Sequence, residues 1–333
     1  MWTNLSKKIK VPLENKIIKL REERQLLGRF LVILGSRPGL VHKLSEVIGN
    51  FEMSVVPRSL VAVDGTLHIP SDKSSSMKTI EGGKSKDISV LTNSRNGTRK
   101  RILIVDAMET LKSINKTPKM IKIYDLQEEF IKRIVKMMKG YDEGRIVFDR
   151  YVDQSLKHNT RSKRSETSTE FAVHPDMCLT MSIKDLLSAS STKRKLTTMI
   201  ALATLEHFMS NNNAEVVVVY DNKIVKGVCP DSEVLHTHEE ADTLIPNQVL
   251  ACIGANEHDG FGLDIVVSSP DTDVLIYCID VAANGKLKEN TTLQFITGKG
   301  TNRRVLDVWE RVNEIGSAKT KALVGFHNFT GAD

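Results

Sequence analysis

The chain has 333 residues and a formal net charge of +6, with 40% hydrophobic and 26% charged residues. This composition is typical of globular domains and excludes a collagen-like or largely disordered chain. No apolar run approaches the roughly 18 residues that a membrane span needs, and because no apolar stretch follows the first residues, MWTNLSKKIKVP, we expect no secretory signal. The four cysteines are widely spaced and form no CxxC pair, so we expect reduced thiols in an intracellular protein, without zinc or disulfides.

Charge is distributed unevenly along the chain. Residues 1–100 hold 18 Lys and Arg against 9 Asp and Glu, whereas residues 201–333 hold 10 against 19. A basic first part suits a polyanionic partner. The acidic last third is either a solvated surface or a cluster of metal-binding carboxylates, and the positions of the acids along the chain decide between the two.

Residues 1–70 are interpreted as an amino-terminal extension. Apolar residues at helical spacing predict an amphipathic helix over 13–34, and residues 55–70 predict a hairpin that turns at Asp64 and Gly65. Residues 71–100 are rich in Ser, Lys, Gly and Asn and are predicted to form a flexible basic linker.

From residue 101 to 333, short apolar runs alternate with helical segments. We expect strands at 101–106, 144–149, 214–221, 263–269 and 293–297. Helices are expected between them at 107–115, 126–140, 182–211 (two helices), 239–253, 273–283 and 307–316. Such alternation predicts an α/β fold with a parallel, doubly wound sheet flanked by helices. Right-handed crossovers then place the carboxyl ends of the strands at one edge, where such sheets bind ligands.

Carboxylates follow strand after strand of this predicted sheet. A single Asp at the end of a strand is usually the cap of the next helix. Several together would repel one another unless cations lay among them. The residues concerned are Asp106, Asp149, Asp221, Glu240, Asp242, Asp271, Asp273 and, at the last position, Asp333.

The ligand chemistry of these acids favours Mg²⁺ or Mn²⁺, because both ions prefer oxygen donors. Two such ions can together stabilise the attacking and leaving oxygens of a phosphodiester. His236, His238 and His327 lie near the acids in the sequence, but their spacing matches no zinc site, and surface or supporting roles are expected for them.

Five segments of the chain, in the same order, resemble motifs of the flap-endonuclease/XPG-type 5′ nucleases of the PIN-like superfamily. They are ILIVDAMETL, IVFDRYVDQSLKHNTRSKRS, HEEADTL, SSPDTDVLIY and FTGAD. The sequence is similar, more closely still, to proteins of this superfamily that are common in animal genomes and are associated with mobile elements. These proteins share phrases similar to SVVPRSL, HEEADTL, SSPDTDV and a final F-T-G-x-D.

The resemblance implies a PIN-like core over 101–333 and a nuclease that hydrolyses phosphodiester bonds with two metal ions. The implied catalytic, metal-binding residues are Asp106, Asp149, Glu240 and Asp242 for one ion and Asp271, Asp273 and Asp333 for the other. Asp242 stands where the family has Glu. The implied basic residues of a helical arch, which would bind the strand, are Lys157, Arg161, Lys163 and Arg164. The resembled nucleases continue beyond this point with a region that grips duplex DNA, so the core is expected to be truncated at its carboxyl end.

Two local features add to or complicate this interpretation. The segment TGKGTNRR could bind a phosphate through Arg303 and Arg304, although an ordinary loop is the simpler alternative. Pro246 lies four residues after Asp242, where its ring would clash with that residue's carbonyl group in a continuous helix. Either a new helix begins at Pro246 or the acidic turn is distorted.

Nucleic acid is therefore the expected partner, DNA before RNA, in a nuclear protein with no membrane contact and no small-molecule cofactor. Two alternatives stay open. One is a nucleic-acid-binding protein that keeps a nuclease fold without turnover, derived from a mobile element. The other is a Mg²⁺-dependent phosphatase of another α/β fold, which the D-A-M sequence at Asp106 disfavours because a D-x-D motif would be needed there.

Overall fold

The computed structural model describes two stretches near the amino end and most of the chain from Ser74 onward. The described ranges are 6–13, 16–23, 74–83, 85–91, 99–151, 170–211, 215–227, 229–236, 238, 240–255, 262–285, 287, 290–298 and 300–330. The chain divides into two compact units, residues 1–75 and 76–333, and each is described by itself.

In the first unit, β1 (Ser6–Leu13) and β2 (Lys16–Glu23) pair antiparallel as a hairpin, with Leu13 opposite Lys16. The helix predicted over 13–34 is therefore wrong for residues 16–23. The segment contains the β-branched pair Ile17 and Ile18, which favours an extended chain once a partner strand is present. The hairpin predicted at 55–70 lies outside the described residues.

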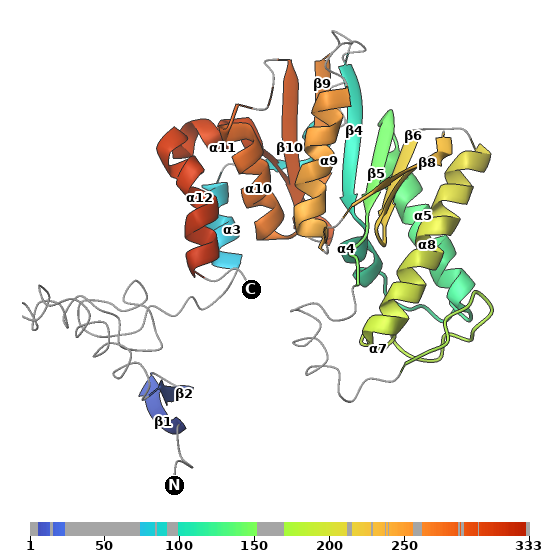
Figure 1. Ribbon diagram of the computed structural model, residues 1–333, viewed down its shortest axis with the longest axis horizontal. Helices are drawn as coiled ribbons and strands as arrows, with labels where there is room; N and C mark the ends of the chain where they lie inside the picture. The colour runs from blue at the N-terminus through green and yellow to red at the C-terminus, as the bar shows by residue number, and fades with distance from the viewer. Residues whose placement is uncertain are drawn as a thin grey trace, which may run out of the picture. The chain divides into compact units, whose positions relative to one another are not determined.

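The second unit is an α/β fold built on one mixed, mostly parallel sheet (Figure 1). Its nine described strands run in the order β3-β11-β10-β9-β4-β5-β6-β7-β8. Their bounds are β3 Lys86–Asp87, β4 Arg99–Asp106, β5 Glu143–Val147, β6 Glu215–Tyr220, β7 Lys223–Lys226, β8 Cys229–Leu235, β9 Gly262–Ser268, β10 Thr291–Thr297 and β11 Arg304–Asp307.

The five central strands, β10, β9, β4, β5 and β6, are mutually parallel. The antiparallel strands β7 and β8 extend the sheet beyond β6, while β11 and β3 extend it beyond β10. From β4 the chain winds outward to β5 and β6, then returns to lay β9 on the other side of β4. The sheet therefore has a topological switch point between β4 and β9, where ligands of doubly wound sheets bind.

Helices cover both faces of the sheet because its strands alternate between two buried surfaces. Along β4, Leu103 and Val105 pack into one core cluster, and Ile102 and Ile104 pack into the other. The first cluster is closed by α4 Ala107–Lys112, α5 Ile123–Met138, α7 Ile183–Leu186 and α8 Ser190–Asn211. The second is closed by α3 Ser74–Glu81, α9 Ala241–Ala255, α10 Thr272–Ala283, α11 Val308–Ile315 and α12 Ser317–Thr330.

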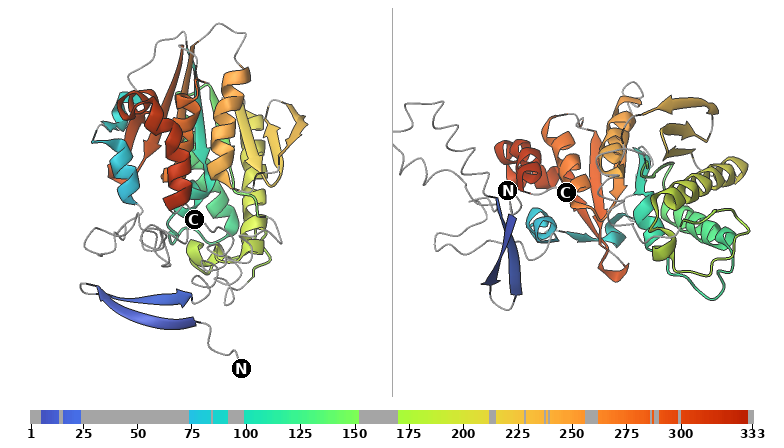
Figure 2. Two further views of the ribbon diagram at one scale, coloured as in Figure 1. Left: turned by 60° about the vertical axis from the view of Figure 1, so that its left-hand side comes forward. Right: turned by 60° about the horizontal axis from the view of Figure 1, so that its bottom comes forward.

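The figures show how these helices are distributed over the sheet. In Figure 1, α9 and α10 lie in front of the strands, with α12 beside α10. Helices α5 and α8 lie side by side, as the right-hand view of Figure 2 shows. Short 3₁₀ turns at Ile88–Leu91 and Gly300–Asn302 complete the described elements of this unit.

The segment 71–100 is not the flexible linker that its composition predicts, at least where it is described. Helix α3 buries Met77 and Ile80 in the core, and Leu91 is also buried. Strand β3 pairs antiparallel with β11 at the edge of the sheet. Part of the expected linker thus belongs to the core, whose first described residues precede Arg101 by more than twenty positions.

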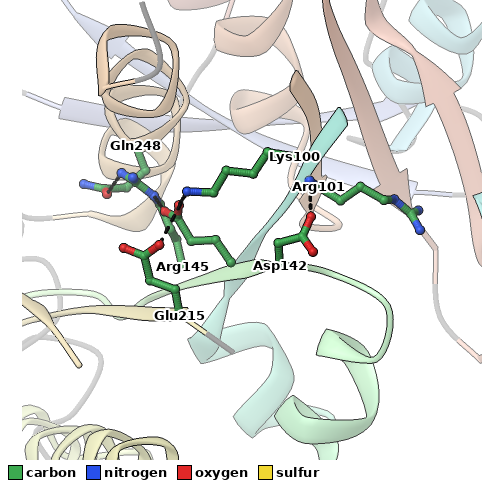
Figure 3. Close-up of polar contacts among 7 residues, drawn as sticks. Lys100, Arg101, Asp142, Arg145, Glu215 and Gln248 are labelled. Atoms are coloured by element: carbon green, nitrogen blue, oxygen red, sulfur yellow. Dashed lines mark hydrogen bonds and ion pairs between the residues drawn. The ribbon is translucent and has the colours of Figure 1, made fainter. Parts of the chain in front are cut away.

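Charged residues meet at the opposite, amino edge of β4, β5 and β6 (Figure 3). The Arg145 guanidinium contacts Glu143 Oε1 at 2.6 Å and donates to Gln248 Oε1 at 2.9 Å. Lys100 Nζ lies 2.7 Å from Glu143 and 3.4 Å from Glu215. Burial alone would raise the pKa of the Glu143 carboxyl, but Arg145 and Lys100 together hold it below its ordinary value. The network joins three strands to α9 at the edge remote from the switch point.

Candidate functional site

Three aspartates lie at the carboxyl ends of adjacent parallel strands. Asp106 is the last residue of β4, and Asp149 follows Phe148 directly after β5. Phe148 still donates its N–H to Val219 O of β6 at 2.9 Å, which keeps the chain along the sheet up to Asp149. Asp271 follows the end of β9 as the N-cap of α10. The strand ends therefore gather these acids at the switch point, as the sequence predicts.

Ser269 connects the ends of β4 and β9. Its hydroxyl donates to Asp106 Oδ2 at 3.3 Å, and its oxygen accepts from the N–H of Asp271 at 3.2 Å. The side chain is buried, with 2% of its surface exposed. The other oxygen of Asp106 accepts from Glu109 N at 2.9 Å and so caps α4. Hydrogen bonds from Ser269 after β9 and from Glu109 of α4 thus hold the two oxygens of Asp106.

Asp149 performs the corresponding function between β5 and α9. Its Oδ1 accepts from the N–H of Ala241 at 3.0 Å, and its Oδ2 accepts from the Tyr151 hydroxyl at 3.3 Å. Ala241 is the first residue of α9 and lies between Glu240 and Asp242. The contact therefore brings the acidic start of α9 to the strand end that carries Asp149, across about ninety residues of sequence.

The electrostatics of Asp106 reflect this crowding. Burial raises the pKa of the Asp106 carboxyl to about 6, against the opposing hydrogen bond from Glu109, and the negative charge of Asp149 raises it further. Ionised Asp106 is consequently disfavoured beside Asp149. A cation between the two carboxylates would relieve this cost, because an opposite charge favours the ionised form.

Asp271 and Asp273 begin α10 and have different partners. Asp271 Oδ1 accepts from the N–H of Asp273 at 3.0 Å, which makes Asp271 the cap of the helix. Asp273 Oδ1 lies 2.7 Å from His327 Nε2 on α12. This contact ties α12, a helix that sequence reasoning missed, to the acidic edge.

Helix α9 resolves the alternative posed by Pro246. The helix is continuous from Ala241 to Ala255 with Pro246 inside it, so no new helix begins there. Asp242 consequently lies in the first turn of α9, one residue beyond the contact to Asp149. The ring of Pro246 removes the N–H that would bond to the carbonyl of Asp242.

The site is nevertheless not a preformed metal cage in the described part of the chain. Among the described residues, no three His, Cys, Asp or Glu side chains lie close enough together to hold one ion. Asp106, Asp149 and Asp271 each use one oxygen on a helix start. The structure does not describe five of the predicted site residues, namely Asp333, Lys157, Arg161, Lys163 and Arg164.

A cavity of about 700 Å³ adjoins Asp106. Its wall includes Arg303 but not Arg304, which pairs instead with Glu81 of α3. The two arginines that the sequence offered as phosphate contacts thus differ in role. The cavity is also lined by basic residues of α5 and its C-cap, which sequence reasoning overlooked. They are Lys132, Arg133, Lys136 and Lys139.

Comparisons with known proteins leave the chain without an assigned family. No protein-family model matches the sequence, and no curated protein matches it. Among the helices of the described residues, none is both long and apolar enough to cross a membrane.

Proposed function

We propose that this chain is a metal-dependent nuclease with a PIN-like core, which hydrolyses phosphodiester bonds of DNA or RNA in the nucleus. One observation carries the proposal. Asp106, Asp149 and Asp271 come from three adjacent parallel strand ends at the switch point. Ser269 links the Asp106 carboxylate to the backbone of Asp271, and the start of α9 binds the Asp149 carboxylate. Capping alone does not require three acids to lie at neighbouring strand ends, nor Ser269 to link the Asp106 carboxylate with the end of β9.

The available donors suit Mg²⁺ or Mn²⁺. The side chains around the strand ends offer carboxylate oxygens, which hard divalent cations prefer. A carboxylate has two oxygens and about four lone-pair directions, so an oxygen that caps a helix does not exhaust its capacity. When bound, divalent ions here would polarise the phosphate and lower the proton affinity of the attacking water.

The residues of the chain would act as follows. Asp106, Asp149 and Asp271 would hold the ions, with Glu240, Asp242 and Asp273 joining them directly or through water. Ser269 would fix the orientation of the Asp106 carboxylate, and His327 would orient Asp273. Basic side chains beside the acids would bind the phosphates of the strand, because a cleft lined by carboxylates alone would repel a polyanion.

A second candidate is a nucleic-acid-binding protein with the same fold but no turnover. It is favoured by one observation, namely that Asp106, Asp149 and Asp271 each cap a helix while no described triad of ligands is close enough for a shared ion. On this alternative the acids are structural, and the basic cavity wall alone accounts for binding.

Cleavage assays separate the two candidates. Labelled flap, hairpin and single-stranded DNA and RNA are incubated with the full chain and Mg²⁺ or Mn²⁺, beside Asp106→Asn and Asp271→Asn. The nuclease proposal predicts metal-dependent products that both substitutions reduce by about a hundredfold or more, since each removes a charge that holds the ion. Binding of substrate without any cleavage by the unsubstituted chain would favour the second candidate.

A further inference from the structure

The cavity beside Asp106 combines an acidic corner with a basic wall. Asp106 and Glu109 lie at one side, and the strand ends contribute Ser268, Ser269 and Pro270. Residues of α5 and of the β10–β11 connection also line the cavity. A volume of about 700 Å³ falls within the range of small-ligand sites.

Three lysines of the wall lie on one face of the chain around α5. Lys132 and Lys136 are four residues apart and so lie on one side of α5, and Lys139 follows as the C-cap of the helix. All three are exposed, and among the described residues none of them forms an ion pair with a carboxylate. Neighbouring Arg133, by contrast, is engaged by Glu129 at 3.1 Å and by the carbonyl of Ser113 at 3.2 Å. The lysines thus present positive charge that the described fold does not neutralise.

Arg303 lies in the β10–β11 connection and lines the same cavity as the three lysines. Its guanidinium contacts the Ser268 hydroxyl at 3.4 Å, and no described carboxylate pairs with it. Burial lowers the pKa of Arg303, with a small opposing effect of Tyr141. Arg304 and Arg311, the next two arginines, each have a glutamate partner. A half-buried guanidinium without a counter-ion is costly to maintain and suits an anionic ligand.

The connection that carries Arg303 has a specific shape. Gly298 has a φ of +85°, and a Cβ there would lie 2.2 Å from the carbonyl oxygen of Asn302. Only glycine fits this turn. Apolar side chains make up another part of the cavity lining, here called the apolar floor; they are Ile88, Leu91, Leu103, Met137, Tyr141 and Ile296.

We propose that this cavity binds one nucleotide unit of a nucleic-acid strand, with its phosphate between Arg303 and the lysines of α5 and its base on the apolar floor. The inference rests on the proposed nuclease function, because Asp106 lines the same cavity and the bound nucleotide would adjoin the bond that is cut. The cavity therefore sets the register of the strand at the acidic edge.

Binding measurements without divalent cations test this inference separately from catalysis. The full chain is titrated in EDTA with a deoxynucleoside monophosphate and with short oligonucleotides that end in a 5′-phosphate, a 3′-phosphate or hydroxyls only. Arg303→Gln should weaken binding at least about tenfold, as expected for the loss of a charge-assisted contact, and Lys136→Gln about threefold. Arg303→Lys keeps the charge and should retain part of the affinity. Lys116→Gln, a change of an exposed lysine outside the cavity, should have no effect.

The outcomes are distinguishable. Tighter binding of phosphate-ended strands, dependent on Arg303, supports a terminal phosphate as the ligand, and equal binding of all strands with the same dependence supports an internal phosphodiester. Affinities unaffected by Arg303→Gln in a folded variant, or no binding of any probe, would overturn the inference. If the inference about the cavity fails but the chain still cleaves its substrates, the nuclease proposal stands. If binding depends on Arg303 but no substrate is cleaved, the nuclease proposal fails and the cavity remains a nucleotide-binding site.

Discussion

Asp106 has one interaction that stabilises the fold and one feature that opposes its ionisation. As the N-cap of α4 it accepts from Glu109 N, which stabilises the helix start. As a buried acid beside Asp149 it is costly to ionise, and its pKa is raised to about 6. Residues at functional sites commonly retain such a cost because the function requires the charge.

Asp106→Asn is predicted to stabilise the cation-free protein at neutral pH. Asn caps a helix as well as Asp does. The folded pKa of about 6 exceeds the reference value of 3.8, so the folded state binds more protons between these values. Wild-type stability therefore falls as pH rises from about 4 to about 6 and stays lower above, by at most about 3 kcal/mol. Urea unfolding in EDTA from pH 4 to 8 measures this. A variant less stable than wild type at pH 7.5 would contradict the assigned burial.

Ser269→Ala removes the link between the ends of β4 and β9. The alanine can neither donate to Asp106 nor accept from Asp271 N, and the loss of a buried hydrogen-bonding group should cost about 1–2 kcal/mol of stability. We expect cleavage to fall about tenfold and the half-saturating Mn²⁺ concentration to rise, because Asp106 loses its orienting partner. The matched control is Ser188→Ala, an exposed hydroxyl that bonds only to its own turn. Equal effects of the two substitutions would argue against a positioning role.

At the scale of elements, the sequence predicts the parallel centre well and the margins poorly. The apolar runs that become β4, β5, β6, β9 and β10 are buried from both sides, so their composition alone reveals them. Strands β7, β8 and β11 lie toward the edges of the sheet, where pairing with a neighbouring strand decides whether a segment is extended. Helix α12 was missed because its apolar residues do not form a clear helical stripe, and its contacts with α10 hold it in place.

The buried network at the amino edge makes a prediction for the sheet. Glu143→Gln would leave the buried Arg145 guanidinium with a neutral partner, at a cost of about 3–5 kcal/mol in urea unfolding (Figure 3). Asp142→Asn, a nearby exposed change, should cost far less. Because the pKa of Glu143 is lowered, its contribution is present above the ordinary glutamate pKa and is lost as pH falls through the lower folded value.

Divalent-cation binding by a folded Glu143→Gln variant should be unchanged, since the network lies at the edge opposite the acids. A parallel loss of cation affinity would show that the two edges are coupled, which the account does not predict.

For the whole molecule, the strand order determines where chemistry can occur. Sequence order alone could place Asp106, Asp149 and Asp271 on one edge, because parallel strands share a direction. It could not show that β9 inserts next to β4, nor that Ser269 binds Asp106 and the N–H of Ala241 binds Asp149. The cavity was also beyond prediction, because Arg303 and α5 are more than 150 residues apart and meet only in the fold.

The most direct test of the central claim is the number of Mn²⁺ ions bound to the full chain, measured by electron paramagnetic resonance. Asp307 supplies a matched control, since it caps α11 through Glu310 N at 3.0 Å but ends β11, which runs antiparallel to β10 and so ends away from the acidic edge. The account predicts that the unsubstituted chain and Asp307→Asn bind Mn²⁺ equally, while the double variant Asp106→Asn/Asp271→Asn loses it. Equal Mn²⁺ binding by all three folded proteins, or none by any, would show that these aspartates are helix caps and not a metal site.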